Sequence, residues 1–215
     1  MESRIKTYNL IAAVAVFITL PVLFYTLGDF TRRTFLKETI SLQTILAFFI
    51  MLMQFYLSRA NSLISKGHEA GIVIKWHKVL GYVFVSVILI HPFLIVLPRY
   101  FEAGIGPYKA FTELVSNFNK QGLILGLSAW ILIGIIGLTS LLRNKLPFTY
   151  KTWRVIHGCL TIAFILTASL HVIDMGRHII KPIAWVIIIL SISGVAMLLR
   201  TYIFKSVSPK ISDHA

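Results

Sequence analysis

Cysteine and acidic residues are scarce in this 215-residue sequence, which contains one cysteine and eight Asp or Glu residues. The single cysteine, Cys159, excludes an internal disulfide framework and any metal or iron–sulfur site built from several cysteines. Charged residues make up only 13% of the chain, whereas soluble globular proteins contain about 25%. Hydrophobic residues make up 57%, which excludes intrinsic disorder. We therefore expect an integral membrane protein in a lipid bilayer.

Long apolar runs account for most of the sequence. A helix needs about 20 apolar residues to cross a hydrocarbon core of about 30 Å. Six stretches meet this requirement, at approximately residues 8–27, 40–57, 72–97, 122–142, 153–173 and 179–204. They are continuously apolar and lack the alternation that is typical of a barrel strand. The sequence therefore predicts an all-α membrane protein, a six-transmembrane helix bundle that forms a single domain over residues 1–215.

The basic residues divide unequally between the two sides of this predicted bundle. Thirteen of the 21 Lys and Arg residues lie on the side that holds both termini, residues 58–78 and residues 143–154, and eight lie on the other. Because cytoplasmic connections carry an excess of Lys and Arg, we expect both termini in the cytoplasm and the protein in the bacterial inner (cell) membrane. The net charge of +13 resides in these short connections, so it does not indicate a nucleic-acid partner.

Four histidines lie inside or at the edge of the apolar runs, His77 and His91 in the third and His157 and His171 in the fifth. Ionisable residues at membrane depth are costly and typically mark a functional site. The two histidines of each run are 14 residues apart. That spacing returns to within roughly 40° of the same helix face and separates the two residues by about 21 Å along the axis. Each run therefore presents histidines at two levels of the bilayer.

The third and fifth runs are separated by one helix and so run parallel, which allows their histidines to face each other. We expect His77 opposite His157 toward the cytoplasmic side, and His91 opposite His171 toward the outer side. Two facing imidazoles supply both axial ligands of a haem iron and leave it no open position. The spacing therefore predicts two haems, stacked across the bilayer, that conduct electrons between its two sides.

Other interpretations of the histidines stay open at this point. A membrane histidine can form hydrogen bonds between helices, and a histidine-containing bundle without haem could act as a transporter or proton relay. Zinc or copper is less favoured, because each level offers two histidines and no nearby cysteine or carboxylate. His178 lies seven residues after His171 and is an alternative ligand at the outer level. His68 and His214 lie in polar segments, where we expect solvated side chains.

The two histidine segments resemble a known family. The segments WHKVLGYVFVSVILIHP (76–92) and YKTWRVIHGCLTIAFILTASLH (150–171) are similar to the transmembrane domain of the ferric reductase superfamily. This superfamily includes ferric reductases, NADPH oxidases and a bacterial haem subunit that serves a periplasmic methionine sulfoxide reductase. The resemblance implies two b-type haems, with the four histidines named above as the ligands of their irons.

The resemblance also implies which branch of the superfamily fits. The methionine sulfoxide reductase subunit typically lacks a counterpart of His77, so the presence of His77 favours the ferric reductase and oxidase branch. The haem membrane subunit of a methionine sulfoxide reductase system stays the alternative, because it is similar in length and also lacks a flavin domain.

One feature of many members is missing from this sequence. They continue into a cytoplasmic domain that binds FAD and NAD(P)H, but here Gly104-Ile105-Gly106 is followed by Pro107 in a connection and is no dinucleotide fingerprint. Unless a flavin domain has been removed, we expect an oxidoreductase component supplied by a separate cytoplasmic flavoprotein reductase, or by FMN, FAD or quinone bound at the cytoplasmic side. The expected acceptors at the outer face are a ferric chelate, dioxygen or a periplasmic redox protein.

A cationic residue accompanies one of the histidines. Arg154 lies three residues before His157 and on the same helix face. Haem propionates are anionic, so we expect Arg154 to help bind the cofactor. The alternative is an ordinary interfacial cation whose charged group reaches water.

Overall fold

A computed structural model describes residues 2–31, 33–58, 69–116 and 120–205, and His68 and His214 lie outside the described residues. The elements are, in chain order, α1 (Glu2–Val14), the π-helical turn η1 (Ala15–Thr19), α2 (Leu20–Leu27), α3 (Phe35–Tyr56), α4 (Glu69–Ala103), α5 (Pro107–Val115), α6 (Gln121–Leu141), the 3-10 turn η2 (Arg143–Lys145), α7 (Tyr150–Met175) and α8 (Lys181–Lys205). Every element in this part of the chain is helical, which confirms the all-α prediction.

Six of these helical stretches are long and apolar enough to cross a membrane, as the sequence predicted. They are Tyr8–Leu27, Phe35–Tyr56, Gly71–Ala103, Gln121–Leu141, Tyr150–Met175 and Lys181–Tyr202. The third is longer than the predicted 72–97, because α4 continues through Pro92 and Pro98. Membrane helices tolerate proline when neighbouring groups satisfy the freed backbone. The chain is therefore an integral, multi-pass membrane protein.

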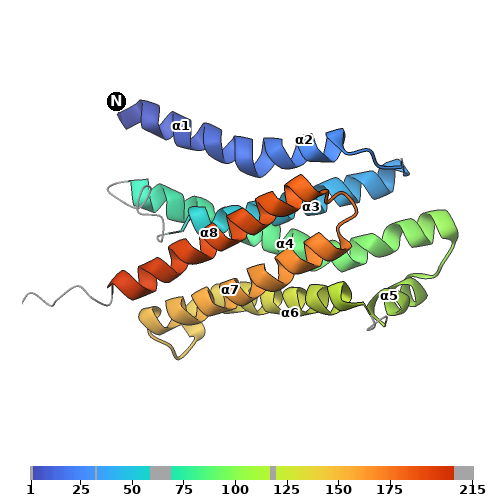
Figure 1. The fold of residues 1–215 in the computed structure, drawn as a ribbon. Coiled ribbons are helices and arrows are strands. Elements are labelled where there is room, and N and C mark those ends of the chain that lie inside the picture. The colour runs from blue at the N-terminus through green and yellow to red at the C-terminus, as the bar shows by residue number, and fades with distance from the viewer. Residues whose placement is uncertain (1, 32, 59–68, 117–119, 206–215) are drawn as a thin grey trace, which may run out of the picture.

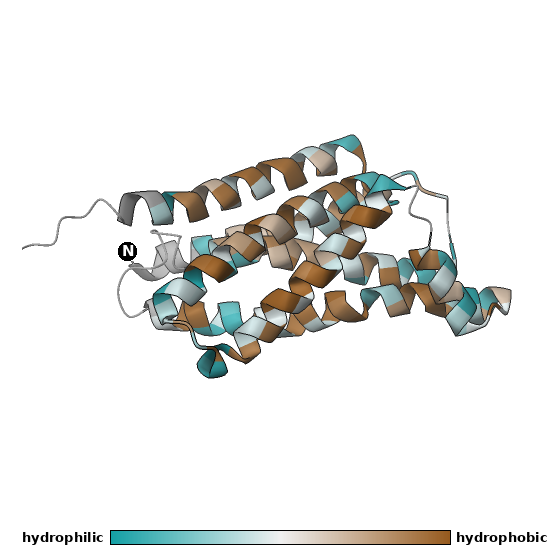
Figure 2. Cartoon of the chain, turned by 90° about the horizontal axis from the view of Figure 1, so that it is seen from below, coloured by the Kyte–Doolittle hydropathy of each residue, from teal (hydrophilic) through white to brown (hydrophobic). Residues whose placement is uncertain are grey.

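The long helices lie side by side in one bundle (Figure 1). α1 begins and α8 ends at the same end of the bundle, which we call the terminal end, and α5 lies at the other, the α5 end. Hydrophilic residues concentrate toward the two ends, and hydrophobic residues follow the lengths of the helices between them (Figure 2). This distribution suits a bundle whose middle lies in hydrocarbon and whose ends reach water.

α3 is the most enclosed of the six spans and forms the centre of the bundle. Its Phe49 and Leu52 are fully buried against Ile133 of α6, Ile165 of α7 and Ile187 of α8. Lipid tails are as apolar as these side chains, so close packing rather than exclusion of water holds the helices together. α3 therefore fixes where the other helices stand.

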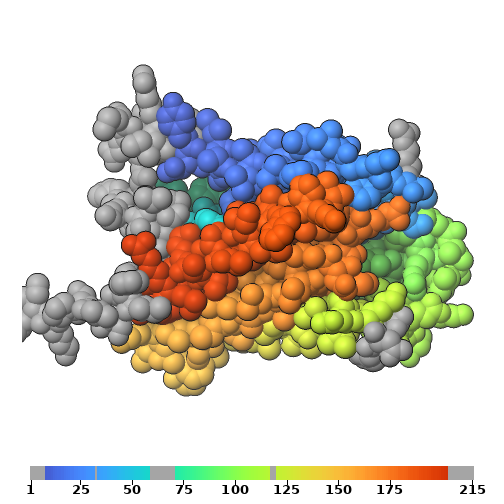
Figure 3. Space-filling view, in the orientation of Figure 1, coloured from blue at the N-terminus to red at the C-terminus, as the bar shows by residue number. Residues whose placement is uncertain are grey.

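The outward faces of the bundle are apolar. On α8, Trp185, Ile189 and Ile192 are each more than 60% exposed, and this helix lies across one face of the molecule between α2 and α7 (Figure 3). Side chains of this kind are the usual lipid-facing residues of a membrane helix. The surface thus agrees with the membrane assignment.

The two helices that carry the paired histidines, α4 and α7, do not pack closely against each other in the described residues. Instead α3 packs along α4, and α6 packs along α7. α6 approaches α7 closely where Gly122 and Gly126 face it, since small residues let membrane helices come together. α7 begins where the Thr149 hydroxyl accepts a hydrogen bond from the Thr152 N–H.

Candidate functional site

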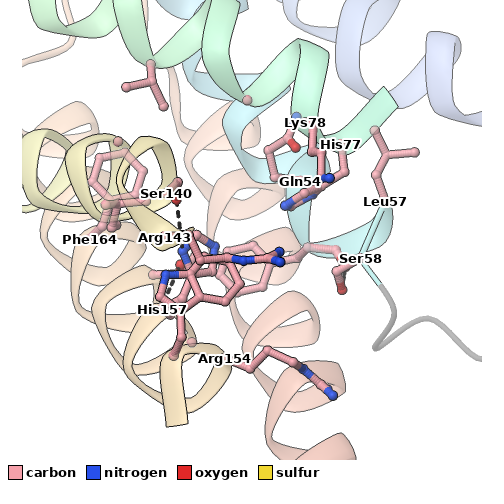
Figure 4. A pocket seen from close by; sticks show the side chains of 18 of the residues that line it. Gln54, Leu57, Ser58, His77, Lys78, Ser140, Arg143, Arg154, His157 and Phe164 are labelled. Carbon is pink, nitrogen blue, oxygen red and sulfur yellow. Dashed lines mark hydrogen bonds between the residues drawn. The ribbon is translucent and has the colours of Figure 1, made fainter. Parts of the chain in front are cut away.

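A cavity of about 400 Å³ opens between α4 and α7 toward the terminal end of the bundle. His77 of α4 and His157 of α7 lie on opposite walls of this cavity (Figure 4). α3 and α6 supply the rest of its lining, including Gln54 and Ser140. The structure therefore brings His77 and His157 to one space, as the 14-residue spacing led us to expect.

Cationic side chains line the same cavity, namely Lys78, Arg143 and Arg154. The guanidinium carbon of Arg143 lies 4.9 Å from the ring centre of Tyr150 and 5.4 Å from that of Trp153. The guanidinium carbon of Arg154 lies 5.9 Å from the ring centre of Tyr150. Such cation–π contacts hold a guanidinium in place without neutralising its charge. The cavity thus has a positive rim suited to anionic groups.

The ring nitrogens at this level are loosely held. His157 Nδ1 lies 3.4 Å from the Ser140 hydroxyl oxygen, and its ring stacks on Trp153 at 5.0 Å between ring centres. His77 Nδ1 is buried and has no hydrogen-bond partner among the described residues, and the same is true of Gln54 Oε1. Buried polar atoms are normally satisfied, so unsatisfied ones inside a cavity call for an explanation.

The second level lies toward the α5 end, where His171 is held firmly. Its Nδ1 lies 2.7 Å from the Gly122 carbonyl oxygen. A carbonyl only accepts hydrogen bonds, so Nδ1 carries the proton and Nε2 is left with the lone pair. A Cβ added at Gly126 would lie 2.6 Å from the imidazole. Glycine at this position therefore provides the space that the ring occupies.

His91 is fixed in the same tautomer by a different route. Its Nδ1 lies 3.1 Å from the Thr44 hydroxyl oxygen, which itself donates to the Ile40 carbonyl over 2.7 Å. Because a hydroxyl has one proton and Thr44 gives it to Ile40, His91 Nδ1–H must be the donor to Thr44. His91 Nε2 then keeps its lone pair.

These observations fit a haem with two axial imidazoles. A histidine that ligates a metal through Nε2 typically donates its Nδ1–H to an oxygen acceptor, which orients the ring. His91 and His171 meet that requirement, and the positive rim around His77 and His157 suits propionates. Among the described residues, no group of three or more His, Cys, Asp or Glu side chains is placed to hold a metal ion. Two histidines at each level match a haem iron whose two axial ligands are both imidazoles.

His178 belongs to a separate cluster at the α5 end. Its Nε2 lies 3.2 Å from a Glu38 carboxylate oxygen and 3.2 Å from an Arg33 nitrogen, and its ring stacks on Tyr25. Burial lowers the pKa of His178, the Glu38 carboxylate opposes that shift, and Arg33 and Arg177 reinforce it. The Nε2 atom is thus already engaged away from His91 and His171.

Four residues of the site were not predicted from the sequence: Thr44, Gln54, Ser140 and Arg143. Three are polar side chains within apolar spans, which is itself a signal of a functional role. Arg143 stands in a short connection among other basic residues, and nothing in the sequence distinguishes it from them. Its place in the cavity depends on the rings of the following helix.

The chain matches the model of a known protein family. A family model described as the ferric reductase like transmembrane component matches residues 43–168. The chain belongs to this family. The matched segment contains three of the four paired histidines and ends three residues before His171.

A relative from Archaeoglobus fulgidus, described as an uncharacterized protein, is 35% identical over 161 residues. The aligned region covers 75% of this chain and 87% of the relative. No solved structure matches the chain. Membership of the ferric reductase-like transmembrane family indicates electron transfer in a membrane, and it confirms the resemblance inferred from the two histidine segments.

Proposed function

We propose that this protein is a di-haem b-type cytochrome that carries electrons across the membrane. The observation that carries the proposal is the pairing of histidines at two levels, one pair across the cavity and one pair with both Nε2 atoms left as lone-pair nitrogens. We assign His77 and His157 to the haem iron near the terminal end. His91 and His171 then hold the haem iron near the α5 end.

When bound, a haem iron with two imidazole ligands takes up and releases a single electron without binding a substrate itself. The protein's own contribution is positional. The 14-residue spacing of the histidines on one helix separates the two levels by about 21 Å along its axis. Gly122 and Thr44 orient the imidazoles at the α5 end, and the apolar core around α3 holds the helices in place.

The positive rim at the terminal end has a role in the same proposal. Arg154, Arg143 and Lys78 line the cavity with His77 and His157. Charge-assisted hydrogen bonds to carboxylates are stronger than those between neutral groups, so these side chains hold the propionates of the nearer haem. They also raise its reduction potential, because a nearby positive charge stabilises the electron that arrives.

The direction of transfer follows from the orientation that we infer. With both termini in the cytoplasm, the His77 level faces the electron donor, a flavin- or NAD(P)H-linked reductase. The His91 level faces the acceptor, which is a ferric chelate, dioxygen or a redox protein outside the membrane. The net step is outer-sphere transfer of electrons from the reduced flavin to the acceptor.

A visible spectrum of purified protein, expressed with ample haem, tests the proposal. We expect a red protein with a reduced b-type spectrum and, by pyridine haemochrome, about two haems per chain. His77→Ala is expected to halve the haem content, whereas His178→Ala keeps both haems because His178 lies in its own cluster. A colourless wild-type protein would refute the cytochrome and favour a histidine-based transporter or proton relay. Undiminished haem in His77→Ala would refute the pairing.

A further inference from the structure

The hydrogen-bond acceptors of the paired histidines follow one pattern. His171 and His157 of α7 meet acceptors on α6, the Gly122 carbonyl at 2.7 Å and the Ser140 hydroxyl at 3.4 Å. His91 of α4 meets its acceptor on α3, the Thr44 hydroxyl. In each case the acceptor comes from the helix that packs along the histidine's own helix. By this pattern the acceptor for His77 of α4 should also come from α3.

Two buried polar atoms in the cavity lack a hydrogen-bond partner in the described part of the chain. His77 Nδ1 and Gln54 Oε1 are both buried and both lack a hydrogen-bond partner among the described residues. One is a ring nitrogen that can carry a proton, and the other is an amide oxygen that only accepts. A buried donor and a buried acceptor that both lack a partner each raise the free energy of the folded protein. A single hydrogen bond between them would satisfy both atoms.

Gln54 is well placed to make that bond. It lies on α3, and its side chain lines the cavity beside His77 (Figure 4). A Cβ added at Gly81, one turn after His77 on α4, would lie 3.9 Å from Gln54 Oε1. The amide oxygen therefore stands over the α4 turn that carries His77. Forming this bond requires rotation of the Gln54 side chain, whose Nε2 lies 3.5 Å from the Ile50 carbonyl oxygen.

We propose that Gln54 is the positioning residue for His77, accepting a hydrogen bond at Oε1 from His77 Nδ1–H while His77 Nε2 faces the cavity. This inference rests on the proposed function, because it assigns Nε2 of His77 to the iron of the haem near the terminal end. It makes α3 the helix that orients both α4 histidines, through Thr44 at one level and Gln54 at the other. An acceptor on Nδ1–H raises the basicity of the ligating nitrogen, and so lowers the reduction potential of that haem alone.

The test uses the full chain in lipid nanodiscs and compares wild type with Gln54→Leu, Gln54→Glu and Gln43→Leu. Gln43 lies on the same helix with an exposed side chain, so Gln43→Leu is the matched control. Haem content, the two midpoint potentials and the electron paramagnetic resonance spectrum of the oxidised protein are measured. His77→Ala identifies which signal belongs to the haem near the terminal end.

We expect Gln54→Leu to weaken retention of that haem by about 10–100-fold, as losses of such oriented hydrogen bonds do, and to raise its potential. Gln54→Glu keeps an acceptor, retains the haem and lowers its potential below that of wild type. The other haem and the Gln43→Leu control are expected to match wild type in both properties.

The outcomes separate the two claims. If wild type holds two haems but both Gln54 variants match Gln43→Leu, the role of the Gln54 side chain is refuted and the proposed function stands. A change confined to the haem that His91→Ala removes would also refute it. A colourless wild-type protein would refute the proposed function and this inference together.

Discussion

The two histidine levels of this bundle are prepared to different degrees. At the α5 end both imidazoles are held by hydrogen bonds of ordinary length, 2.7 Å for His171 and 3.1 Å for His91, and Gly126 provides space for a ring. At the terminal end the His157 contact is 3.4 Å, and His77 Nδ1 has no partner among the described residues. One level is oriented by the polypeptide, and the other is open and positively charged.

This difference indicates that the two levels are preorganised for a ligand to different degrees. An imidazole with a fixed tautomer and orientation needs little rearrangement to bind iron, so in the proposed cytochrome the α5 level is preorganised for a haem. At the terminal level of the proposed cytochrome, the cavity and its cations attract the cofactor, and the imidazoles reorient when it binds. We therefore expect the two haems to respond differently to the same kind of mutation.

Filling the space beside His171 should have the largest effect. In Gly126→Ala the new Cβ would lie 2.6 Å from the imidazole, a distance that forces the ring to move. We expect the haem near the α5 end to be lost, which lowers the haem content from two to one per chain. Gly134→Ala on the same helix is the control, because its Cβ would lie 3.7 Å from Leu89 in ordinary contact. Two haems in Gly126→Ala would show that His171 does not depend on the space at Gly126.

Removing the acceptor of His91 should have a smaller effect. Thr44→Val keeps the shape of the side chain and deletes the hydroxyl, so haem affinity at the α5 level should fall by about tenfold. Thr44→Ser keeps the acceptor and should restore it. At the terminal level Ser140→Ala should change affinity less, because a 3.4 Å contact is a weak hydrogen bond. Haem dissociation rates to an excess of apomyoglobin measure all three, and equal losses would remove the difference between the levels.

The sequence predicted the parts of this site that follow from periodicity. Continuous apolar runs specify spans, and a 14-residue spacing specifies two levels on one helix face. The facing of His77 and His157 across a cavity agrees with that expectation. The longer extent of α4 was not predicted, because Pro98 reads as a helix terminator in water and is tolerated in a membrane helix.

The acceptors of the imidazoles could not be predicted in the same way. Thr44, Ser140 and Gln54 act across helices, and hydropathy does not say which helices are neighbours. The Gly122 acceptor is a main-chain carbonyl, which every residue possesses, so no side-chain pattern could reveal it. The prediction of His178 as an alternative ligand used helical phase beyond Met175, where α7 has already ended.

Neutralising the positive rim should shift a potential without removing a haem. Arg154→Gln is expected to lower the midpoint potential of the haem near the terminal end, because one stabilising positive charge is lost. The shift should shrink as salt rises, since ions screen partly exposed charges. Lys145→Gln removes a charge from the preceding connection, outside the cavity lining, and serves as the control. Redox titrations at low and high salt measure the shift, and equal shifts in both variants would mean that Arg154 has no specific role.

The smallest effect should come from the ionisable cluster at the α5 end. The pKa of His178 is lowered in the folded protein, chiefly by burial and further by Arg33 and Arg177 against the opposing Glu38 carboxylate. The unfolded chain then binds more protons than the native one as pH falls below the ordinary histidine pKa of about 6.5. Stability should therefore decline on acidification from pH 7 to pH 5. In His178→Gln this part of the pH dependence should vanish, as thermal unfolding in detergent at several pH values would show. An unchanged dependence of stability on pH in His178→Gln would show that other groups cause the acid sensitivity.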